Sequence, residues 1–376
     1  MQKAFIDHDR LVNNFLELVK IDSPSGHESE IVQEVSARFH RMGVPTQQDS
    51  VGNIIALLEG EGEPIIYSAH LDTVEPGRNI KPTISGNIIS SGGDTILGAD
   101  NKDAVVAILE NIYVIQKYSL SRRCLEIVFT IGEEHISAGA KHLDYSLLRS
   151  KRAIIFDGVY GVGNIIISAP YCSRFEIIIK GKKAHAARPE QGINAIKAAC
   201  LAINQLPVGR VNEMTASNIA FIKGGIVGSA DNQEVILVDE SRHNSVPDYV
   251  KLGGEVRGLD RNAFESTLKK FEVGFRATAD EFGADCSFVQ SQLANGYVHS
   301  KDDDWVQEIA QGFENIGIKP KFIDSLGGSD ANIFNLHSIK AVDVGATHQK
   351  SHSTDEFIII DDLIRLTEFL LSFALI

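Results

Sequence analysis

The chain has 376 residues, of which 43% are hydrophobic and 23% are charged, as is usual for a soluble globular protein. That length exceeds one ordinary domain and predicts two. The formal net charge of −14 argues against a protein that binds nucleic acid or an anionic membrane surface through its overall charge.

Helical and strand-like segments alternate in the first part of the chain. An amphipathic stripe of Leu11, Phe15, Leu18 and Val19 predicts the first helix. In chain order we expect helices over 8–20 and 29–42, strands over 51–58 and 64–69, a helix over 102–118, a strand over 125–131, a helix over 137–149 and a strand over 152–156. This alternation predicts an α/β fold, a mostly parallel sheet with helices on both faces.

The pattern changes after Ala169-Pro170. The segments that follow are strands over 173–179, 218–222, 249–257 and 286–293 and helices over 192–206 and 262–282. Two helices against a small antiparallel sheet predict an α+β, ferredoxin-like domain inserted at residues 171–293. A helix over 304–316, a strand over 341–344 and a helix over 361–373 then complete a discontinuous first domain of residues 1–170 and 294–376.

The chain shows no sign of export or membrane insertion. Its N-terminus soon carries acids and lacks an apolar core, which argues against a signal peptide. No apolar run reaches the roughly 20 residues that a spanning helix needs. The four cysteines are Cys124, Cys172, Cys200 and Cys286, and they form no Cys-x-x-Cys pair. We therefore expect buried free thiols and a cytoplasmic protein.

Imidazole and carboxylate side chains stand just past three of the predicted strands. They are His70 and Asp72 after the strand over 64–69, Glu133 and Glu134 after 125–131, and Asp157 after 152–156. The carboxyl ends of parallel strands share one edge of a sheet, and ligands bind there. Because these groups bind zinc-like divalent metals, the sequence predicts a metal site at that edge.

The triplet His-Leu-Asp occurs twice, at 70–72 and at 142–144. His142 and Asp144 fall in a predicted helix, where residues two apart point to nearly opposite sides, so we expect surface residues. In a strand, residues two apart project from the same face. His70 can then ligate a metal while Asp72 accepts the N–H of its other ring nitrogen.

Glu133 and Glu134 follow their strand as direct neighbours. Like charges at such positions repel unless cations or solvent separate them, and adjacent side chains diverge. One glutamate can therefore ligate a metal while the other stays free as a general base. Metal-assisted hydrolysis requires that division of roles.

Asp100 precedes a predicted helix, and two interpretations stay open: it caps the helix, or its carboxylate bridges two metals. Asp157 and His352, the latter in the loop after the last predicted strand, would complete the ligand set. Three carboxylates around one divalent cation would leave the pocket strongly anionic. The charge balance of Asp100, Glu134 and Asp157 therefore favours two cations.

Taken together, these residues resemble the M20 metallopeptidases, and within them the peptidase T-like, tripeptidase-like branch. The segments that carry the resemblance are Ser68–Val74, Leu97–Asp103, Thr130–Glu134, Phe156–Gly158, Gly327–Asn332 and His352-x-x-x-Glu356. The resemblance implies a zinc-exopeptidase-like domain that holds two Zn²⁺ ions, with Co²⁺ or Mn²⁺ as substitutes. In the roles that it implies, His70 and Asp157 hold one ion, Glu134 and His352 hold the other, Asp100 bridges them, Glu133 is the base and Asp72 supports His70.

The inserted domain resembles the family's lid or dimerisation domain, which implies a homodimer. In the segments Gly181–Ala187 and Pro189–Ala195, the resemblance implies that His185 reaches the substrate carbonyl across the dimer. The alternative is that His185 is an exposed polar loop residue.

Further residues resemble the family's substrate-binding groups. Asn244 and Arg257 are implied to bind the substrate carboxylate, which suits a planar guanidinium, although Arg257 could instead form an ion pair within the lid. Gly328 and Ser329 are also implied to contact the substrate. The chain departs from the family pattern at His135, which follows Glu134, and at an insertion over 226–243, where we expect an added hairpin.

The resemblance implies a hydrolase that cleaves the amide bond of small peptides by a metal-activated water, with Glu133 as the base. The nearest alternatives are an N-acyl amino acid deacylase or desuccinylase and a carboxypeptidase of the same superfamily, which use the same metals and base. A binding or scaffold protein on this fold would lack a ligand or the base. Because this chain has all of them, we expect an enzyme.

Overall fold

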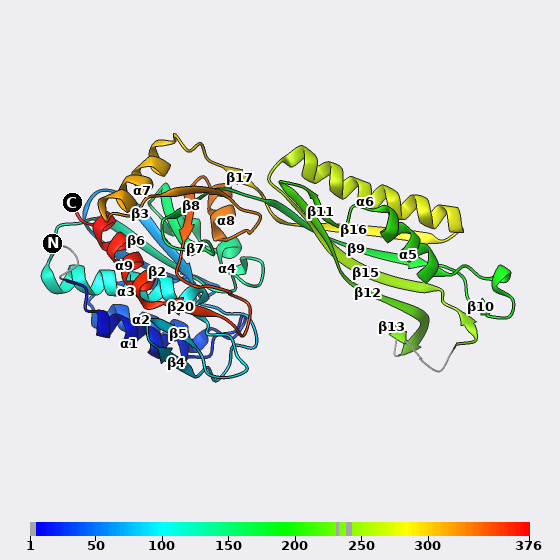
Figure 1. Ribbon diagram of the computed structural model, residues 1–376, viewed down its shortest axis with the longest axis horizontal. Helices are drawn as coiled ribbons and strands as arrows, with labels where there is room; N and C mark the ends of the chain where they lie inside the picture. The colour runs from blue at the N-terminus through cyan, green and yellow to red at the C-terminus, as the bar shows by residue number, and fades with distance from the viewer. Residues whose placement is uncertain (1–4, 231–232, 238–242) are drawn as a thin grey trace. The chain divides into compact units, whose positions relative to one another are not determined.

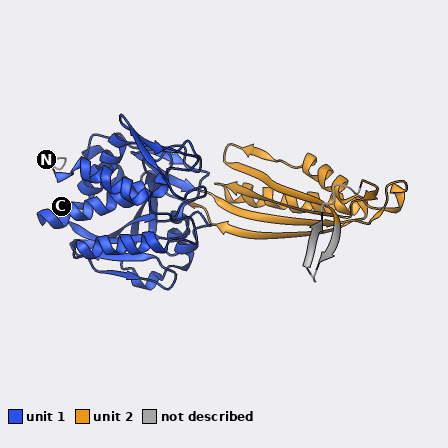
Figure 2. Ribbon diagram, turned by 90° about the horizontal axis from the view of Figure 1, so that it is seen from below, with its two compact units in different colours: residues 1–169, 298–376 blue, residues 170–297 orange. Residues whose placement is uncertain are grey.

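The computed structural model of the protein describes residues 5–230, 233–237 and 243–376. The chain divides into two compact units, residues 1–169 with 298–376 and residues 170–297 (Figure 2). The sequence placed the boundaries of the inserted part at 171 and 293, and the second unit in the structure continues four residues further, to Tyr297.

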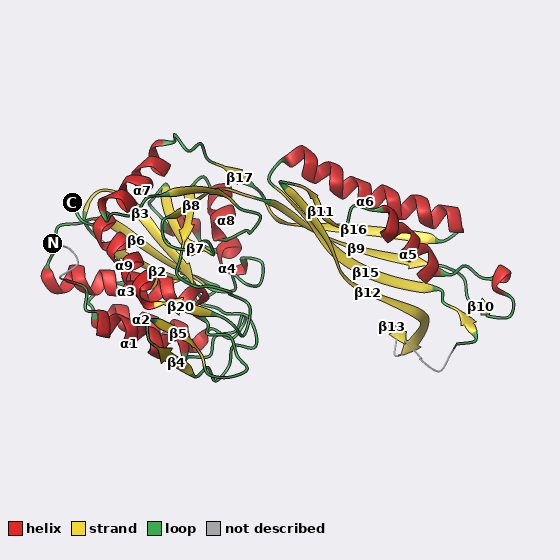
Figure 3. Ribbon diagram, viewed as in Figure 1, coloured by secondary structure: helices red, strands yellow, loops and turns green. Residues whose placement is uncertain are grey.

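The first unit is built on one large mixed sheet (Figures 1 and 3). Its strands are β1 (Thr46–Gln48), β2 (Ile54–Leu58), β3 (Glu61–His70), β6 (Arg123–Thr130), β7 (Arg152–Gly158), β8 (Asn164–Ala169), β18 (Lys321–Asp324) and β19 (Lys340–Gly345). The order is β1-β2-β6-β3-β7-β19-β8, with β18 paired to β8. The four central strands, β6, β3, β7 and β19, are parallel to one another. The strand β2 runs antiparallel to β6, and β8 runs antiparallel to β19 but parallel to β18. The predicted mostly parallel sheet is confirmed.

Five helices cover one face of this sheet. They are α1 (His8–Val19), α2 (Ser29–Arg41), α3 (Ala99–Tyr118), α7 (Asp304–Asn315) and α9 (Ile360–Ala374). Ile65, Tyr67 and Ala69 of β3 point into the shared apolar core, as the two-residue period of a strand requires. Ser68 and His70 therefore face the opposite side, where α8 (Asp330–Leu336) contacts β7 and β19 and packs on α4 (Ala138–His142).

A small antiparallel sheet of β4 (Pro82–Ser85), β5 (Ile88–Ser91) and β20 (Phe357–Ile359) completes the first unit. Among the residues that the structure describes, no helix combines the length and the hydrophobicity that crossing a membrane would require.

The second unit is an antiparallel sheet with two helices. Its main strands are β9 (Tyr171–Lys180), β11 (Gly209–Asn212), β12 (Thr215–Ala230), β15 (Tyr249–Gly258) and β16 (Asp285–Ala294), in the order β11-β12-β15-β9-β16. The helices α5 (Ala195–Gln205) and α6 (Arg261–Phe282) pack on it around Phe175, Ile177 and Phe271. A short bridge joins β10 (Ala184–His185) to β14 (Ser245–Val246). The strand β17 (Tyr297–Val298) follows at the boundary.

The insertion over 226–243 forms the expected hairpin in its described part. The strand β12 extends far beyond the predicted 218–222, and its end pairs antiparallel with β13 (Gln233–Leu237). Residues 231–232 and 238–242 of this insertion lie outside the described residues.

Two expectations from the sequence were wrong in part. The predicted helix over 137–149 is only α4 and a separate turn, Tyr145–Leu147, because Leu143 is extended and the Asp144 carboxylate accepts the N–H of Ser146 at 3.1 Å. His142 and Asp144 are exposed, as expected. The four cysteines are free, and Cys124 and Cys172 are buried as expected, but Cys200 is exposed and Cys286 only half-buried.

Gly345, which ends β19, allows a close approach of two backbone segments. A Cβ at this position would overlap the carbonyl oxygen of Gly161. We expect Gly345→Ala to lower the free energy of unfolding by about 1–3 kcal/mol or more, because the backbone must shift to relieve the overlap. Gly93 has open space around its Cβ position, so Gly93→Ala is a matched control that should change stability by less than about 0.5 kcal/mol. Urea unfolding of both variants measures this, and equal stability would contradict the prediction.

Candidate metal centre

The ends of the parallel strands place the first candidate residues next to one another. His70 is the last residue of β3 and pairs in register with Thr130, the last residue of β6. Asp157 lies near the end of β7, on the other side of β3. Asp100 comes to the same edge from the first turn of α3.

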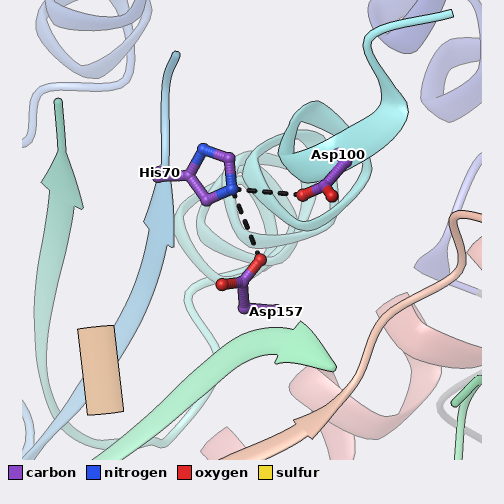
Figure 4. A group of neighbouring side chains, drawn as sticks. All are labelled: His70, Asp100 and Asp157. Atoms are coloured by element: carbon purple, nitrogen blue, oxygen red, sulfur yellow. Dashed lines mark hydrogen bonds and ion pairs between the residues drawn. The ribbon is translucent and has the colours of Figure 1, made fainter. Parts of the chain in front are cut away.

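One group of ligand atoms consists of His70, Asp100 and Asp157 (Figure 4). The Nε2 atom of His70 lies 3.1 Å from Asp100 Oδ1 and 3.3 Å from Asp157 Oδ1. His70 and Asp100 are buried, and the side chain of Asp157 is 10% exposed. Asn101 donates a hydrogen bond from Nδ2 to Asp157 Oδ1 at 2.9 Å and so orients that carboxylate.

A second group consists of Asp100, Glu134 and His352. The Nε2 atom of His352 lies 2.7 Å from Glu134 Oε1 and 3.5 Å from Asp100 Oδ2. Asp100 therefore belongs to both groups and turns a different oxygen toward each of them. Within each group, the ligand atoms lie within 4.8 Å of one another.

The electrostatics of these groups suit divalent cations. In the described part of the chain, the basic groups that contact Asp100, Asp157 and Glu134 are the imidazoles of His70, His348 and His352. Burial, with a contribution from the charge of Asp100, raises the pKa of Asp157 to about 6. Hydrogen bonds to Asp100 and Glu134 raise the pKa of His352 to about 10. Carboxylates crowded in this way need positive charge nearby, and two His/Asp/Glu groups sharing one carboxylate are a donor set that fits two zinc-like ions.

The Asp72 carboxylate makes hydrogen bonds that the sequence did not indicate. We expected its carboxylate to support His70, but the nearer acceptor of His70 Nδ1 is the Asp72 backbone carbonyl at 2.9 Å, while the carboxylate lies at 3.4 Å. That carboxylate instead accepts the backbone N–H groups of Glu133 at 2.9 Å and Glu134 at 3.1 Å, and the hydroxyl of Ser25 at 2.6 Å. Asp72 thus fixes the backbone that carries both glutamates.

Glu133 stands beside the two groups without belonging to either of them. Burial, reinforced by the negative charge of Asp157, raises the pKa of Glu133 well above its usual range. Ser137 donates to its Oε1 at 3.3 Å. The Glu28 carboxylate accepts the N–H of Gly132 at 3.1 Å and fixes the residue before it. A carboxylate with a raised pKa is a better proton acceptor than an ordinary one.

The backbone around Asp100 favours the bridging interpretation over the helix cap. Asp100 has extended angles (φ −76°, ψ 99°), and its carboxylate faces His70 and His352. The Glu356 carboxylate accepts the N–H of Gly98 at 2.7 Å and that of Asp100 at 3.0 Å. Glu356 therefore satisfies these amides and leaves the Asp100 side chain free to face the imidazoles.

Two buried residues near the centre were missed by the sequence analysis. His348 Nε2 lies 3.9 Å from Asp100 Oδ2, and His348 Nδ1 lies 3.3 Å from Asp103 Oδ2. Asp103 stands three residues after Asp100, a spacing that would place both residues on one face of a regular helix, although Asp100 itself has extended angles. That spacing was the available signal for Asp103. The sequence held none for His348 beyond its position four residues before His352.

The predicted substrate-binding residues are distributed over both units. His185 in β10 and Asn244 are exposed and adjacent, since Ala186 N–H donates to the Asn244 carbonyl at 2.8 Å. Arg257 in β15 pairs with Glu255 at 2.7 Å, the ion pair that the alternative interpretation anticipated. In the first unit, Gly328 is exposed. Ser329 is buried and caps α8.

Comparison with known proteins gives consistent similarities over the whole chain. The model of peptidase family M20/M25/M40 matches residues 66–376. A tripeptidase from Staphylococcus aureus, whose crystal structure is known, is 32% identical, with a TM-score of 0.91 and 98% of each chain covered. The crystal structure of aminopeptidase PepT from Bacillus cereus is also 32% identical, with a TM-score of 0.87 and 98% of each chain covered. The uncharacterized protein YqjE of Bacillus subtilis is 32% identical over 378 residues, which cover 98% of each chain.

Asp100 belongs to both ligand groups, so replacing it should change how many ions the chain binds. We expect wild-type protein to bind two divalent cations and Asp100→Ala to bind fewer than two, because each group loses one of its three ligands. Metal analysis after equilibrium dialysis measures the ratio, with the exposed His142→Ala as a control that keeps two. Two ions bound to Asp100→Ala would contradict the bridging role.

Asp330 should make the stability of the metal-free chain depend on pH. This buried carboxylate accepts the hydroxyl of Thr130 at 2.6 Å, and burial raises its pKa from 3.8 to about 6. Between these values the folded chain binds more protons than the unfolded one, so this group lowers stability as the pH rises. Relative to wild type, Asp330→Asn should gain stability between pH 4 and pH 7, by a value on the order of 3 kcal/mol at most. Urea unfolding in a chelator checks this, and a difference that stays constant with pH would contradict it.

Proposed function

This chain belongs to peptidase family M20/M25/M40, and we propose that it hydrolyses the amide bonds of small peptides as a two-metal, tripeptidase- or aminopeptidase-like enzyme. The observation that carries the proposal is the pair of ligand groups that share Asp100, with the half-buried Glu133 beside them. The similarity to a tripeptidase and to aminopeptidase PepT, at 32% identity over nearly the full chain, supports this substrate class.

The proposed ion assignment follows the two groups. His70 and Asp157 would hold one ion, Glu134 and His352 would hold the other, and Asp100 would contribute to both. Zn²⁺ is the proposed metal, with Co²⁺ or Mn²⁺ as substitutes, because imidazole and carboxylate ligands suit these ions. When bound, such ions polarise the scissile carbonyl and lower the pKa of the attacking water.

The protein groups then handle the proton. Glu133 takes the proton of the attacking water and passes it to the leaving amine. Asp72 holds the amide groups of Glu133 and Glu134, and so keeps the base and a ligand at a fixed spacing. The Asp72 carbonyl orients the His70 ring through Nδ1 and leaves Nε2 to face the centre.

We assign the second unit the roles of lid and dimer contact. His185 would stabilise the oxyanion of the tetrahedral intermediate, and Asn244 with Arg257 would bind the substrate carboxylate. Arg257 is paired with Glu255, so binding of a substrate carboxylate has to compete with that ion pair. Gly328 and Ser329 complete the proposed substrate contacts. We propose a cytoplasmic homodimer formed through this unit.

The role of Glu133 is tested by replacing it with its isosteric amide. Glu133→Gln should keep the fold and two bound ions but lose peptide hydrolysis by several orders of magnitude, because an amide cannot accept the proton. Glu63→Gln, at an exposed glutamate, is the matched control and should hydrolyse peptides normally. Steady-state kinetics with metal analysis of the same samples decide the question. Near-normal turnover by Glu133→Gln would remove Glu133 from the mechanism.

The substrate class is tested with a panel of di- and tripeptides beside N-acyl amino acids. We expect a higher kcat/KM for peptides with a free N-terminus, and for tripeptides above dipeptides. A metal-loaded enzyme that cleaves only N-acyl amino acids would establish the deacylase alternative instead.

A further inference from the structure

The carboxylate of Glu133 has a single hydrogen-bond donor among the residues that the structure describes. That donor is the hydroxyl of Ser137, whose Oγ atom lies 3.3 Å from Glu133 Oε1. The Asp72 carboxylate fixes the backbone N–H of Glu133, but a glutamate side chain rotates about several bonds and can point in different directions from a fixed backbone. The contact with Ser137 is therefore the hydrogen bond that restrains the direction of this carboxylate.

Ser137 is bonded to Glu133 through its backbone as well. Its N–H donates to the Glu133 carbonyl at 2.7 Å. The next two N–H groups, of Ala138 and Gly139, donate at 2.8 Å and 2.9 Å to the carbonyls of the two residues that precede Glu133. Three successive hydrogen bonds thus fasten this turn to the end of β6, and Ser137 is buried in it.

The backbone of this turn is strained. Two consecutive residues that are not glycine, Ile136 with φ 67° and Ser137 with φ 50°, have left-handed angles. In this conformation a side chain crowds its own backbone, and a β-branched residue such as Ile136 adopts it least readily. Strain of this kind persists only where the surrounding structure enforces it, and it is concentrated at functional sites. Here it lies within three residues of Glu134 and carries the hydroxyl that contacts Glu133.

A second carboxylate, that of Asp330, competes for the same hydroxyl. Burial raises the pKa of Asp330, and the hydroxyls of Thr130 and Ser137 partly offset that rise. A hydroxyl has one proton and donates it to one acceptor at a time. Thr130 already donates to Asp330 Oδ2 at 2.6 Å, so Asp330 has a close donor of its own. The Ser137 hydroxyl is therefore available to Glu133.

We propose that Ser137 is a positioning residue for the base: its hydroxyl, carried by the left-handed turn, holds Glu133 Oε1 and leaves Oε2 to accept the proton of the attacking water. This inference rests on the proposed function of Glu133. At 3.3 Å the hydrogen bond is longer than the usual ~2.7–2.8 Å between two oxygens, so it orients the carboxylate while withdrawing little of its charge. Misplacement of a reacting group by 1 Å can cost about a hundredfold in rate, and loss of one long hydrogen bond should cost less.

The test separates the hydroxyl from the strained backbone with three substitutions in the full-length chain. Ser137→Ala removes the hydroxyl and keeps the strain, Ser137→Gly removes both, and Ser137→Thr keeps the hydroxyl and adds the strain of a β-branched residue. Ser119 is the matched control site, because it is exposed and has nearly the same backbone angles (φ 50°, ψ 46°) as Ser137 (φ 50°, ψ 43°). The same three substitutions are made there.

The kcat and KM values for the tripeptide trialanine are measured together with the bound metal and the unfolding temperature of the metal-free chain. If wild type cleaves only N-acyl amino acids, N-acetylalanine replaces the tripeptide. Ser137→Ala and Ser137→Gly should each lower kcat about 5–30-fold, with KM within about twofold of wild type and two ions bound. Ser137→Thr should keep kcat within about threefold although it unfolds at a lower temperature. The Ser119 variants should keep kcat within about twofold.

A merely structural role for Ser137 predicts a different order. The losses of activity would then follow the unfolding temperature, so that Ser137→Gly would be the most active variant and Ser137→Thr the least active. The proposed role predicts the reverse, because the hydroxyl and not the backbone decides the rate.

A double substitution tests whether Ser137 acts through Glu133. Ser137→Ala should change the residual rate of Glu133→Gln by less than about twofold, since the carboxylate that it positions is already gone. An equal loss in both backgrounds would show that Ser137 acts independently of Glu133, and would overturn the inference.

Normal kcat in both Ser137→Ala and Ser137→Gly would also overturn the inference, as would equal losses in Ser137→Gly and Ser137→Thr. If Ser137→Thr does not fold, the Ala and Gly variants and the double substitution decide. Glu133→Gln separates this result from failure of the proposed function. Near-normal turnover by Glu133→Gln would refute the base and the inference together, whereas an inactive Glu133→Gln beside normal Ser137 variants would refute only the inference.

Discussion

The metal centre depends on carboxylates that accept backbone amide hydrogen bonds from distant parts of the chain. Asp72 holds the N–H groups of Glu133 and Glu134, Glu356 holds those of Gly98 and Asp100, and Asp103 holds those of Thr347 and His348. Each interaction joins two segments, and one of the two carries a ligand or the base. Such bonds to an ionised acceptor are stronger than neutral ones, and they fix the ligands without help from an ion.

This arrangement is possible because the two faces of the central strands differ. In β3, Ile65, Tyr67 and Ala69 enter the apolar core beneath the helices, while Ser68 and His70 lie on the other face. Burial of a large apolar side chain such as that of Ile65 contributes roughly 1.5–3 kcal/mol. That stabilisation is distributed over one face and allows the strand ends to carry crowded acids and imidazoles, which by themselves are costly to bury.

The parts of the centre that the sequence could indicate are those tied to the ends of strands. His70, Glu134 and Asp157 each follow an apolar run, and parallel strands bring such positions to a common edge, where the structure places them. Asp144 shows the opposite case. The sequence pattern around Asp144 predicted one helix over 137–149. In the structure, the Asp144 carboxylate accepts the backbone N–H of Ser146, and the helix α4 ends before it. A local pattern cannot weigh a competing bond of that kind.

The sequence by itself determined the α/β architecture, the inserted second unit and the residue types available for a metal site, because periodicity and strand ends are local properties. Only the tertiary structure decided which acceptor serves each donor. It directed the Asp72 carboxylate to two backbone amides instead of to His70, and it brought Asp103 to a loop 244 residues later in the chain. Contacts of this kind depend on how separate segments pack, and spacing along the chain carries no information about them.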